Sequence, residues 1–314
     1  GGDEFGLIFP KGLTNEDILQ RVKVARSSMK LPFFIGDGTA TIGSTVGLSR
    51  YPNAGRTRST LFDRADYALY FAKEHAKGES TFFSEHHEED IRRASAIEQK
   101  LREVDLTEEL SMVFQPILDA KSGHVRGFEA LARWYNPDLG HVPPNVFIET
   151  AEQMGMISRL SEVLLRKALV EAVKWPADLG LSFNISAKTL ATRTSILRLL
   201  SIIDRSGFPP ERFIFEITES AVMKDFDVAI SNLEVIKATG VRLSLDDFGT
   251  GYSSLSYVQK LPVDILKVDR AFVQDICTNK ASLHILRSVE HLCSGLNKTC
   301  IVEGVETQEQ VEAI

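Results

Sequence analysis

The sequence predicts an α/β fold in which a TIM-like (β/α) barrel follows a smaller α+β segment. From about residue 106 onward, short β-rich runs alternate with longer amphipathic stretches. Strand followed by helix, repeated, is typical of a parallel sheet with helical crossovers. Several such units follow one another without the pattern of a doubly wound sheet, which favours a barrel. The length of 314 residues fits two domains, or one barrel with an attachment.

The elements of the barrel follow from composition and periodicity. The expected strands are 113–119, 127–134, 181–185, 213–217, 242–245, 264–268 and 300–302. The expected helices are 146–174, 192–206, 227–238, 253–260 and 281–296.

The part before the barrel has a mixed α and β pattern. We expect an apolar run at 5–9, a helix at 17–29, a strand at 39–48 and a helix at 61–73. Residues 84–105 are rich in charges of both signs, and their few apolar residues fall at helical spacing. The expected domains are therefore 1–83, a charged helical linker at 84–105, and 106–314.

Composition and charge exclude several classes of protein. Hydrophobic residues make up 43% and charged residues 25%, as in soluble globular chains, and no apolar run reaches the ~18 residues of a membrane span. The net charge of −7 argues against a partner that is a DNA or RNA polymer. Cys277, Cys293 and Cys300 form no C-x-x-C pair, so we expect reduced thiols of a cytoplasmic protein.

Polar residues recur at the ends of the expected barrel strands, where a (β/α) barrel places its working groups. They are Glu129, Asn184, Glu216, Asp246 with Asp247, Lys267 with Asp269, and Glu303. Carboxylate and amide oxygens suit Mg2+ or Mn2+ better than zinc or copper. Two such ions about 3.5–4 Å apart can activate a water and stabilise the leaving oxygen of a phosphodiester.

Each of these residues also has a plain structural interpretation. A single acid at a strand end is more often a helix cap or a surface charge, and Asp246 and Asp247 could cap the next helix. Lys267 could pair with Asp269 on the surface. The set as a whole, repeating in step with the barrel units, favours a shared site over coincidence.

Longer motifs around these residues resemble a known family. They are FQPI (114–117), EALAR (129–133), NIS (184–186), EITE (216–219), DDFGTGYSSL (246–255), KVD (267–269) and EGVET (303–307). With them, residues 106–314 resemble the EAL domain, the cyclic-di-GMP phosphodiesterase family. Residues 1–83 are similar to the second half of the GGDEF domain, the diguanylate cyclase family, from the GGDEF pentapeptide to ADYALYFAK (65–73).

The resemblance implies a site with two divalent ions, Mg2+ or Mn2+, that hydrolyses cyclic-di-GMP to linear pGpG. The positions implied for the first ion are Glu129, Asn184, Glu216 and Asp246. Those implied for the second ion are Asp246, Asp247 and Glu303. Glu129 and Lys267 are the implied catalytic residues, with Lys267 beside the attacking water.

Further roles are implied around that site. Arg133 matches a residue that contacts a substrate phosphate, and Glu219 matches one that supports the DDFGTGYSS loop. In the N-terminal segment, Gly1, Gly2, Asp3 and Glu4 are the remnant of the GGDEF signature, whose acids bind metal and GTP in an intact cyclase. The family pattern continues beyond Ile314, so we expect the barrel to lack its last strand and helix.

Two other functions remain open at this stage. The barrel could bind cyclic-di-GMP as a receptor without turnover, although the residues that degenerate receptors lose are present here. The full-length parent could also be bifunctional, with cyclase and phosphodiesterase halves. The resemblance further implies a homodimer through the EAL domains, and it leaves open an upstream membrane anchor in the parent.

Overall fold

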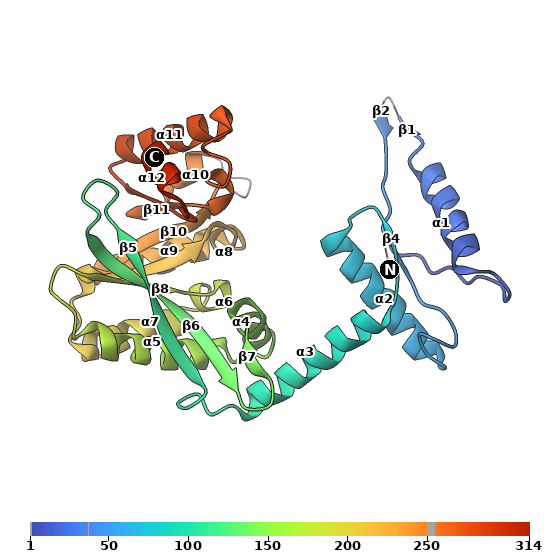
Figure 1. Ribbon diagram of the computed structural model, residues 1–314, viewed down its shortest axis with the longest axis horizontal. Helices are drawn as coiled ribbons and strands as arrows, with labels where there is room; N and C mark the ends of the chain where they lie inside the picture. The colour runs from blue at the N-terminus through green and yellow to red at the C-terminus, as the bar shows by residue number, and fades with distance from the viewer. Residues whose placement is uncertain (1, 37, 250–254) are drawn as a thin grey trace. The chain divides into compact units, whose positions relative to one another are not determined.

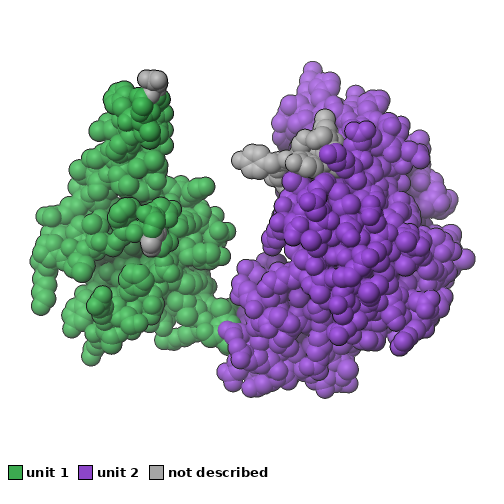
Figure 2. Space-filling view, turned by 180° about the vertical axis from the view of Figure 1, so that it is seen from behind, with its two compact units in different colours: residues 1–96 green, residues 97–314 purple. Residues whose placement is uncertain are grey.

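The computed structural model describes residues 2–36, 38–249 and 255–314. The chain divides into two compact units, residues 1–96 and residues 97–314, which Figure 2 shows in different colours. Helix α3 (Glu85–Glu103) contains the division between them. No helix of the described residues is long and apolar enough to cross a membrane.

Unit 1 combines two long helices with short strands. Its elements are α1 (Asn15–Met29), β1 (Phe33–Ile35), β2 (Gly38–Ala40), β3 (Val46–Leu48), α2 (Arg58–His75) and β4 (Ser80–Phe82). The two expected helices are confirmed. The strand expected at 39–48 is instead two short strands in different sheets, β2 against β1 and β3 against β4. The apolar run at 5–9 has no regular secondary structure.

The packing of α2 on β3 explains one glycine of unit 1. A Cβ at Gly47 would lie 2.1 Å from the carbonyl oxygen of Ala65 and 2.2 Å from the amide nitrogen of Leu69. Ala68 and Ala72, on the same helix, are fully buried. Small residues on both elements therefore allow the two backbones to approach closely.

Unit 2 is built on one curled sheet, a half-barrel that confirms the TIM-like fold (Figure 1). Its strands are β5 (Leu110–Leu118), β6 (Val125–Asn136), β7 (Gly140–Val142), β8 (Gly180–Asn184), β9 (Phe213–Thr218), β10 (Arg242–Phe248), β11 (Ile265–Val268) and β12 (Thr299–Val302). The order is β12-β11-β10-β9-β8-β6-β5, with β7 paired to β6. Neighbours from β6 to β12 are parallel, as expected.

The first strand pair departs from the expected parallel pattern. Strand β5 is antiparallel to β6, because a short connection allows only that arrangement. The turn is closed by Asp119, whose Oδ1 accepts from the backbone N–H and the hydroxyl of Ser122, both at 2.8 Å. Gly123 supplies the left-handed backbone that the turn needs, with φ of 69°.

Helices cover one face of this sheet. They are α4 (Pro144–Gln153), α5 (Ile157–Ala172), α6 (Ala187–Leu190), α7 (Arg193–Ser206), α8 (Glu219–Met223), α9 (Phe226–Ala238), α10 (Leu255–Lys260), α11 (Lys280–Gly295) and α12 (Gln308–Ala313). Single turns of 3-10 helix lie at Pro210–Arg212 and Arg270–Phe272. The helix expected over 146–174 is two helices, because Gly155 adopts a left-handed φ of 71° between them.

Alternation along the strands gives the sheet one apolar and one polar face. On β9, Phe213, Phe215 and Ile217 are fully buried in the core shared with the helices. Successive strand residues point to opposite faces, so Glu216 lies on the other face. The helices thus use the apolar face, and the concave face remains for polar side chains.

The start of unit 2 is held to strand β6 by one carboxylate. Oε2 of Glu109 accepts from Nε1 of Trp134 at 2.9 Å and from Nδ2 of Asn136 at 2.7 Å. Trp134 is 1% exposed and Asn136 5% exposed, so both donors depend on this acceptor for a partner.

Replacing Glu109 with alanine should therefore destabilise unit 2 by about 1–3 kcal/mol, because two buried donors lose their acceptor. Both tryptophans of the chain, Trp134 and Trp175, lie in unit 2, so their fluorescence during urea unfolding reports on this unit. The matched control is Glu108→Ala, since the neighbouring Glu108 is exposed. Equal unfolding midpoints for the two variants would contradict the prediction.

Candidate active site

A buried lysine lies at the centre of the polar face. Lys267 is 2% exposed, and its Nζ contacts four carboxylates. The distances are 2.6 Å to Oε1 of Glu303, 2.9 Å to Oε2 of Glu216, 3.1 Å to Oε2 of Glu129 and 3.4 Å to Asp246. The structure therefore brings together five of the residues that the sequence placed at separate strand ends.

Each member of this cluster comes from a different part of the sheet. Glu129 lies on β6, Glu216 on β9, Asp246 on β10 and Lys267 on β11, while Glu303 directly follows β12. In parallel β/α folds the carboxyl ends of the strands meet at one edge, so residues distant in sequence become neighbours. The alternative pairing of Lys267 with Asp269 on the surface is wrong, because Lys267 points into the buried cluster.

Burial and neighbouring charges both shift the pKa values of the two innermost groups, Glu216 and Lys267. Burial raises the pKa of Glu216 to about 8, although Lys267 counteracts the rise, and Glu129 and Asp246 add to it. For Lys267, burial alone would lower the pKa, but the surrounding carboxylates keep it above its ordinary value. Lys267 therefore remains an ammonium at neutral pH, and one positive charge faces four acids.

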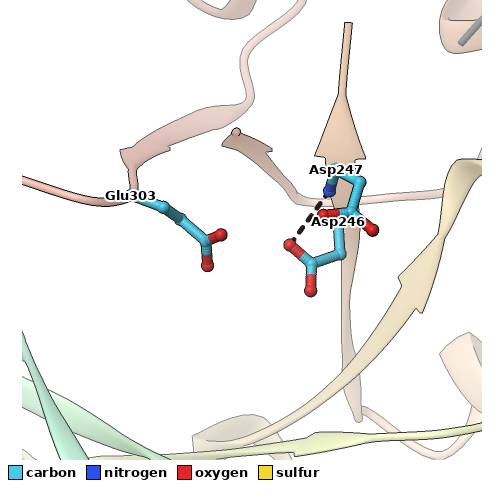
Figure 3. A group of neighbouring side chains, drawn as sticks. All are labelled: Asp246, Asp247 and Glu303. Atoms are coloured by element: carbon cyan, nitrogen blue, oxygen red, sulfur yellow. Dashed lines mark hydrogen bonds between the residues drawn. The ribbon is translucent and has the colours of Figure 1, made fainter. Parts of the chain in front are cut away.

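Asp246, Asp247 and Glu303 form a second grouping at the rim of this cluster. One carboxylate oxygen from each lies within 4.8 Å of the others, and Figure 3 shows Glu303 and Asp246 directed toward the same space. Burial, together with the charges of Asp246 and Asp269, raises the pKa of Asp247. Burial also raises the pKa of Glu303. Such a cluster of acids could bind a metal ion.

The backbone at Asp247 makes this grouping possible. Its φ of 57° is left-handed, which is uncommon outside glycine but is tolerated by aspartate. The N–H of Asp247 donates to Oδ1 of Asp246 at 3.0 Å. Consecutive strand residues normally point to opposite faces, so this departure from strand geometry lets both carboxylates join one cluster.

Asn184 joins the cluster through Glu129. It ends β8, and its Nδ2 donates to Oε1 of Glu129 at 2.8 Å. Glu129 therefore has a partner on each oxygen, the amide of Asn184 on one and the ammonium of Lys267 on the other.

The structure also places two further predicted site residues, Arg133 and Glu219. Arg133 lies on β6 four residues after Glu129, on the same face, and its guanidinium donates to the carbonyl oxygen of Ala132 at 2.8 Å. Glu219 begins α8, directly after β9. The loop that it was expected to support includes residues 250–254, which lie outside the described residues.

The remnant of the GGDEF pentapeptide lies in unit 1. Gly2, Asp3 and Glu4 are exposed and precede α1, while Gly1 falls outside the described residues.

Sequence reasoning missed three polar residues on the same sheet face. Gln115 of β5 is the register partner of Glu129. Ser182 and Ser244 are buried on β8 and β10, two residues before Asn184 and Asp246 respectively. The period of two along a strand could have identified the serines, because residues two apart share a face.

The raised pKa of Glu216 predicts how pH affects the metal-free protein. A carboxyl group with a pKa near 4.5 when unfolded and about 8 when folded binds more protons in the folded state between these values. The free energy of unfolding of unit 2 should therefore fall as pH rises from about 4.5 to about 8. Glu216→Gln should weaken this dependence, because an amide does not ionise.

Tryptophan fluorescence in urea, measured at several pH values with EDTA present, gives this dependence. The control is Glu211→Gln, an exposed glutamate on the turn before β9. A Glu216→Gln variant that keeps the full pH dependence of the wild type would show that Glu216 is not its source.

Sequence comparisons match both units to known families. The profile of the EAL domain matches residues 96–314, and that of the diguanylate cyclase GGDEF domain matches residues 1–79. An uncharacterized signaling protein of Caulobacter vibrioides is 38% identical over 99% of this chain and 39% of its own length. The bifunctional diguanylate cyclase/cyclic di-GMP phosphodiesterase MucR of Pseudomonas aeruginosa is 33% identical over 99% of this chain and 46% of its own. The chain thus spans less than half the length of these curated relatives.

Solved structures agree with the sequence comparison. The phosphodiesterase part of MucR in complex with c-di-GMP matches with a TM-score of 0.65 and 34% identity, covering 69% of this chain and 90% of that one. An EAL domain protein from Listeria monocytogenes matches with a TM-score of 0.62 and 30% identity, covering 70% and 86%. This chain is a GGDEF–EAL tandem, and its unit 2 belongs to the EAL domain family.

Proposed function

We propose that unit 2 hydrolyses one phosphodiester bond of cyclic-di-GMP and releases linear pGpG. The observation that carries the proposal is the cluster of four carboxylates around Lys267 on the concave face of the sheet. The similarity to MucR, whose phosphodiesterase part is described in complex with c-di-GMP, supports this choice of substrate.

The reaction would use two divalent ions, Mg2+ or Mn2+. The proposed ligands of the first ion are Glu129, Asn184, Glu216 and Asp246. The proposed ligands of the second ion are Asp246, Asp247 and Glu303. When bound, the ions would activate a water molecule and stabilise the leaving oxygen.

The residues present fit such ions. Every proposed ligand atom is a carboxylate or amide oxygen, the type that Mg2+ and Mn2+ prefer. Oε1 of Glu216 is buried and has no hydrogen-bond partner among the described residues, so it is available to a cation. One ammonium does not balance four acids, which also favours added positive charge.

Lys267 acts on both the acids and the attacking water. Its ammonium orients the carboxylates of Glu129 and Glu216. It would donate to the attacking water if one of its carboxylate contacts turned to a bound ion, because an ammonium has only three hydrogens to donate. Glu129 in turn fixes the amide of Asn184. Arg133, on the same face of β6, has the planar guanidinium that binds a phosphate through two hydrogen bonds.

The first test is hydrolysis of cyclic-di-GMP by the full chain, with pGpG measured by liquid chromatography. We expect turnover with Mg2+ or Mn2+, no turnover in excess EDTA, and recovery when either ion is restored. Tight binding of the nucleotide without pGpG at any metal concentration would contradict the proposal and would favour a receptor.

Glu129→Gln tests the cluster itself, because it retains the side-chain shape but removes the charge. We expect activity to fall by at least about 100-fold, since even residues that only support metal ligands cost ~10–100-fold when changed. The matched control is Glu211→Gln, which changes an exposed glutamate outside the site. Full activity of Glu129→Gln would remove this residue from the proposed catalytic group.

A second candidate function concerns the full-length protein. The name of MucR includes both activities, diguanylate cyclase and cyclic di-GMP phosphodiesterase. In this chain, Asp3 and Glu4 match the acids that bind metal in an intact GGDEF domain. Consumption of GTP by the full-length protein, lost in Glu4→Ala and retained in Glu16→Ala, would support a cyclase half. Equal GTP consumption by both variants would contradict it. Dimerisation through the EAL domains remains a prediction.

A further inference from the structure

Two buried serines lie on the polar face of the sheet, beneath the acidic cluster. Ser182 on β8 is 1% exposed and Ser244 on β10 is 0% exposed. Within the described residues, neither hydroxyl has a hydrogen-bond partner, and the same is true of Oε1 of Glu216. Three buried polar atoms without partners thus occur on three adjacent strands.

The strand register places each serine beside one carboxylate. Ser244 is the register partner of Glu216, and Ser182 is the register partner of Glu129. Register partners in a parallel ladder point to the same face, about 4.8 Å apart. Each serine therefore lies next to an acid that contacts Lys267.

The chemistry of these atoms is complementary. A serine hydroxyl has one hydrogen to donate, whereas a carboxylate oxygen can only accept. Buried polar groups in folded proteins are almost always hydrogen-bonded, either directly or through an ordered water. A rotation of the serine side chain, or one bridging water, would join Oγ of Ser244 to Oε1 of Glu216.

We propose that Ser244, assisted by Ser182, is a positioning residue that sets the orientation of the Glu216 carboxylate and thereby the affinity of the site for a divalent ion. Lys267 binds Oε2 of Glu216, and Ser244 would supply the contact to Oε1, which has no partner among the described residues. Both oxygens of Glu129 already have partners, so Ser182 contributes less than Ser244. This inference rests on the proposed metal site.

The test is the affinity of the full chain for Mn2+, measured by isothermal titration calorimetry without nucleotide. The Ser244→Thr and Ser244→Val variants are compared with each other, because threonine and valine side chains have the same shape. They differ only in that threonine has a hydroxyl where valine has a methyl group. We expect Ser244→Thr to bind Mn2+ like the wild type. We expect Ser244→Val and Ser244→Ala to bind it about 10–100-fold more weakly, the usual effect of removing a group that orients a metal ligand.

Two controls separate positioning from packing. Ser195→Ala removes a buried hydroxyl on α7, where Ser195 contacts Ser158 at 3.0 Å outside the site, and should leave Mn2+ affinity unchanged. Ser182→Ala should show a smaller loss than Ser244→Ala. Circular dichroism melting confirms that each variant is folded.

The outcomes distinguish this inference from the proposed function. Equal Mn2+ affinity of Ser244→Ala and the wild type would overturn it, as would an equal loss in Ser195→Ala. Equal affinity of the Thr and Val variants would also overturn it. A wild type that binds Mn2+ but releases no pGpG would contradict the phosphodiesterase, while the serine comparison would still hold.

Discussion

The concave face of unit 2 depends on the interaction of one buried ammonium with four carboxylates. A buried lysine without these acids would be costly, and four acids without the lysine would repel one another. Neither half of the cluster is stable in this position without the other. A buried group of charges of this kind adds little to folding stability. The apolar face, with its cover of helices, must therefore provide the stability of unit 2.

The period of two along each strand separates these two roles. Phe215 faces the helices while its neighbour Glu216 faces the cluster, and the same division holds for Leu245 and Asp246. A shift of one residue in the pairing of β9 would bury an acid among apolar side chains and expose phenylalanine. The parallel register is therefore fixed by the same alternation that creates the site.

The sequence was sufficient for much of the fold and of the site. Runs such as 213–217 combine β-branched and aromatic residues between turns, which predicts the strands. Acids at the ends of those strands come together in a barrel, which predicts the cluster. It was insufficient where local geometry overrides composition. The antiparallel pairing of β5 depends on the short turn at Asp119, and the break in 146–174 depends on the backbone of Gly155. The period of two could have placed Ser182 and Ser244 on the same face as the acids, but their burial and their lack of a hydrogen-bond partner among the described residues are known only from the structure.

The left-handed backbone of Asp247 has an evolutionary consequence. Asparagine and glycine adopt this conformation at least as easily as aspartate, whereas valine or isoleucine cannot adopt it without strain. One substitution at this position can therefore remove a charge and leave the end of β10 with the same shape. A descendant of such a domain would keep the backbone at the end of β10 and have one acid fewer in the grouping of Asp246, Asp247 and Glu303. The end of β10 is thus a point at which the charge of this cluster can change in a single mutational step without a change of fold.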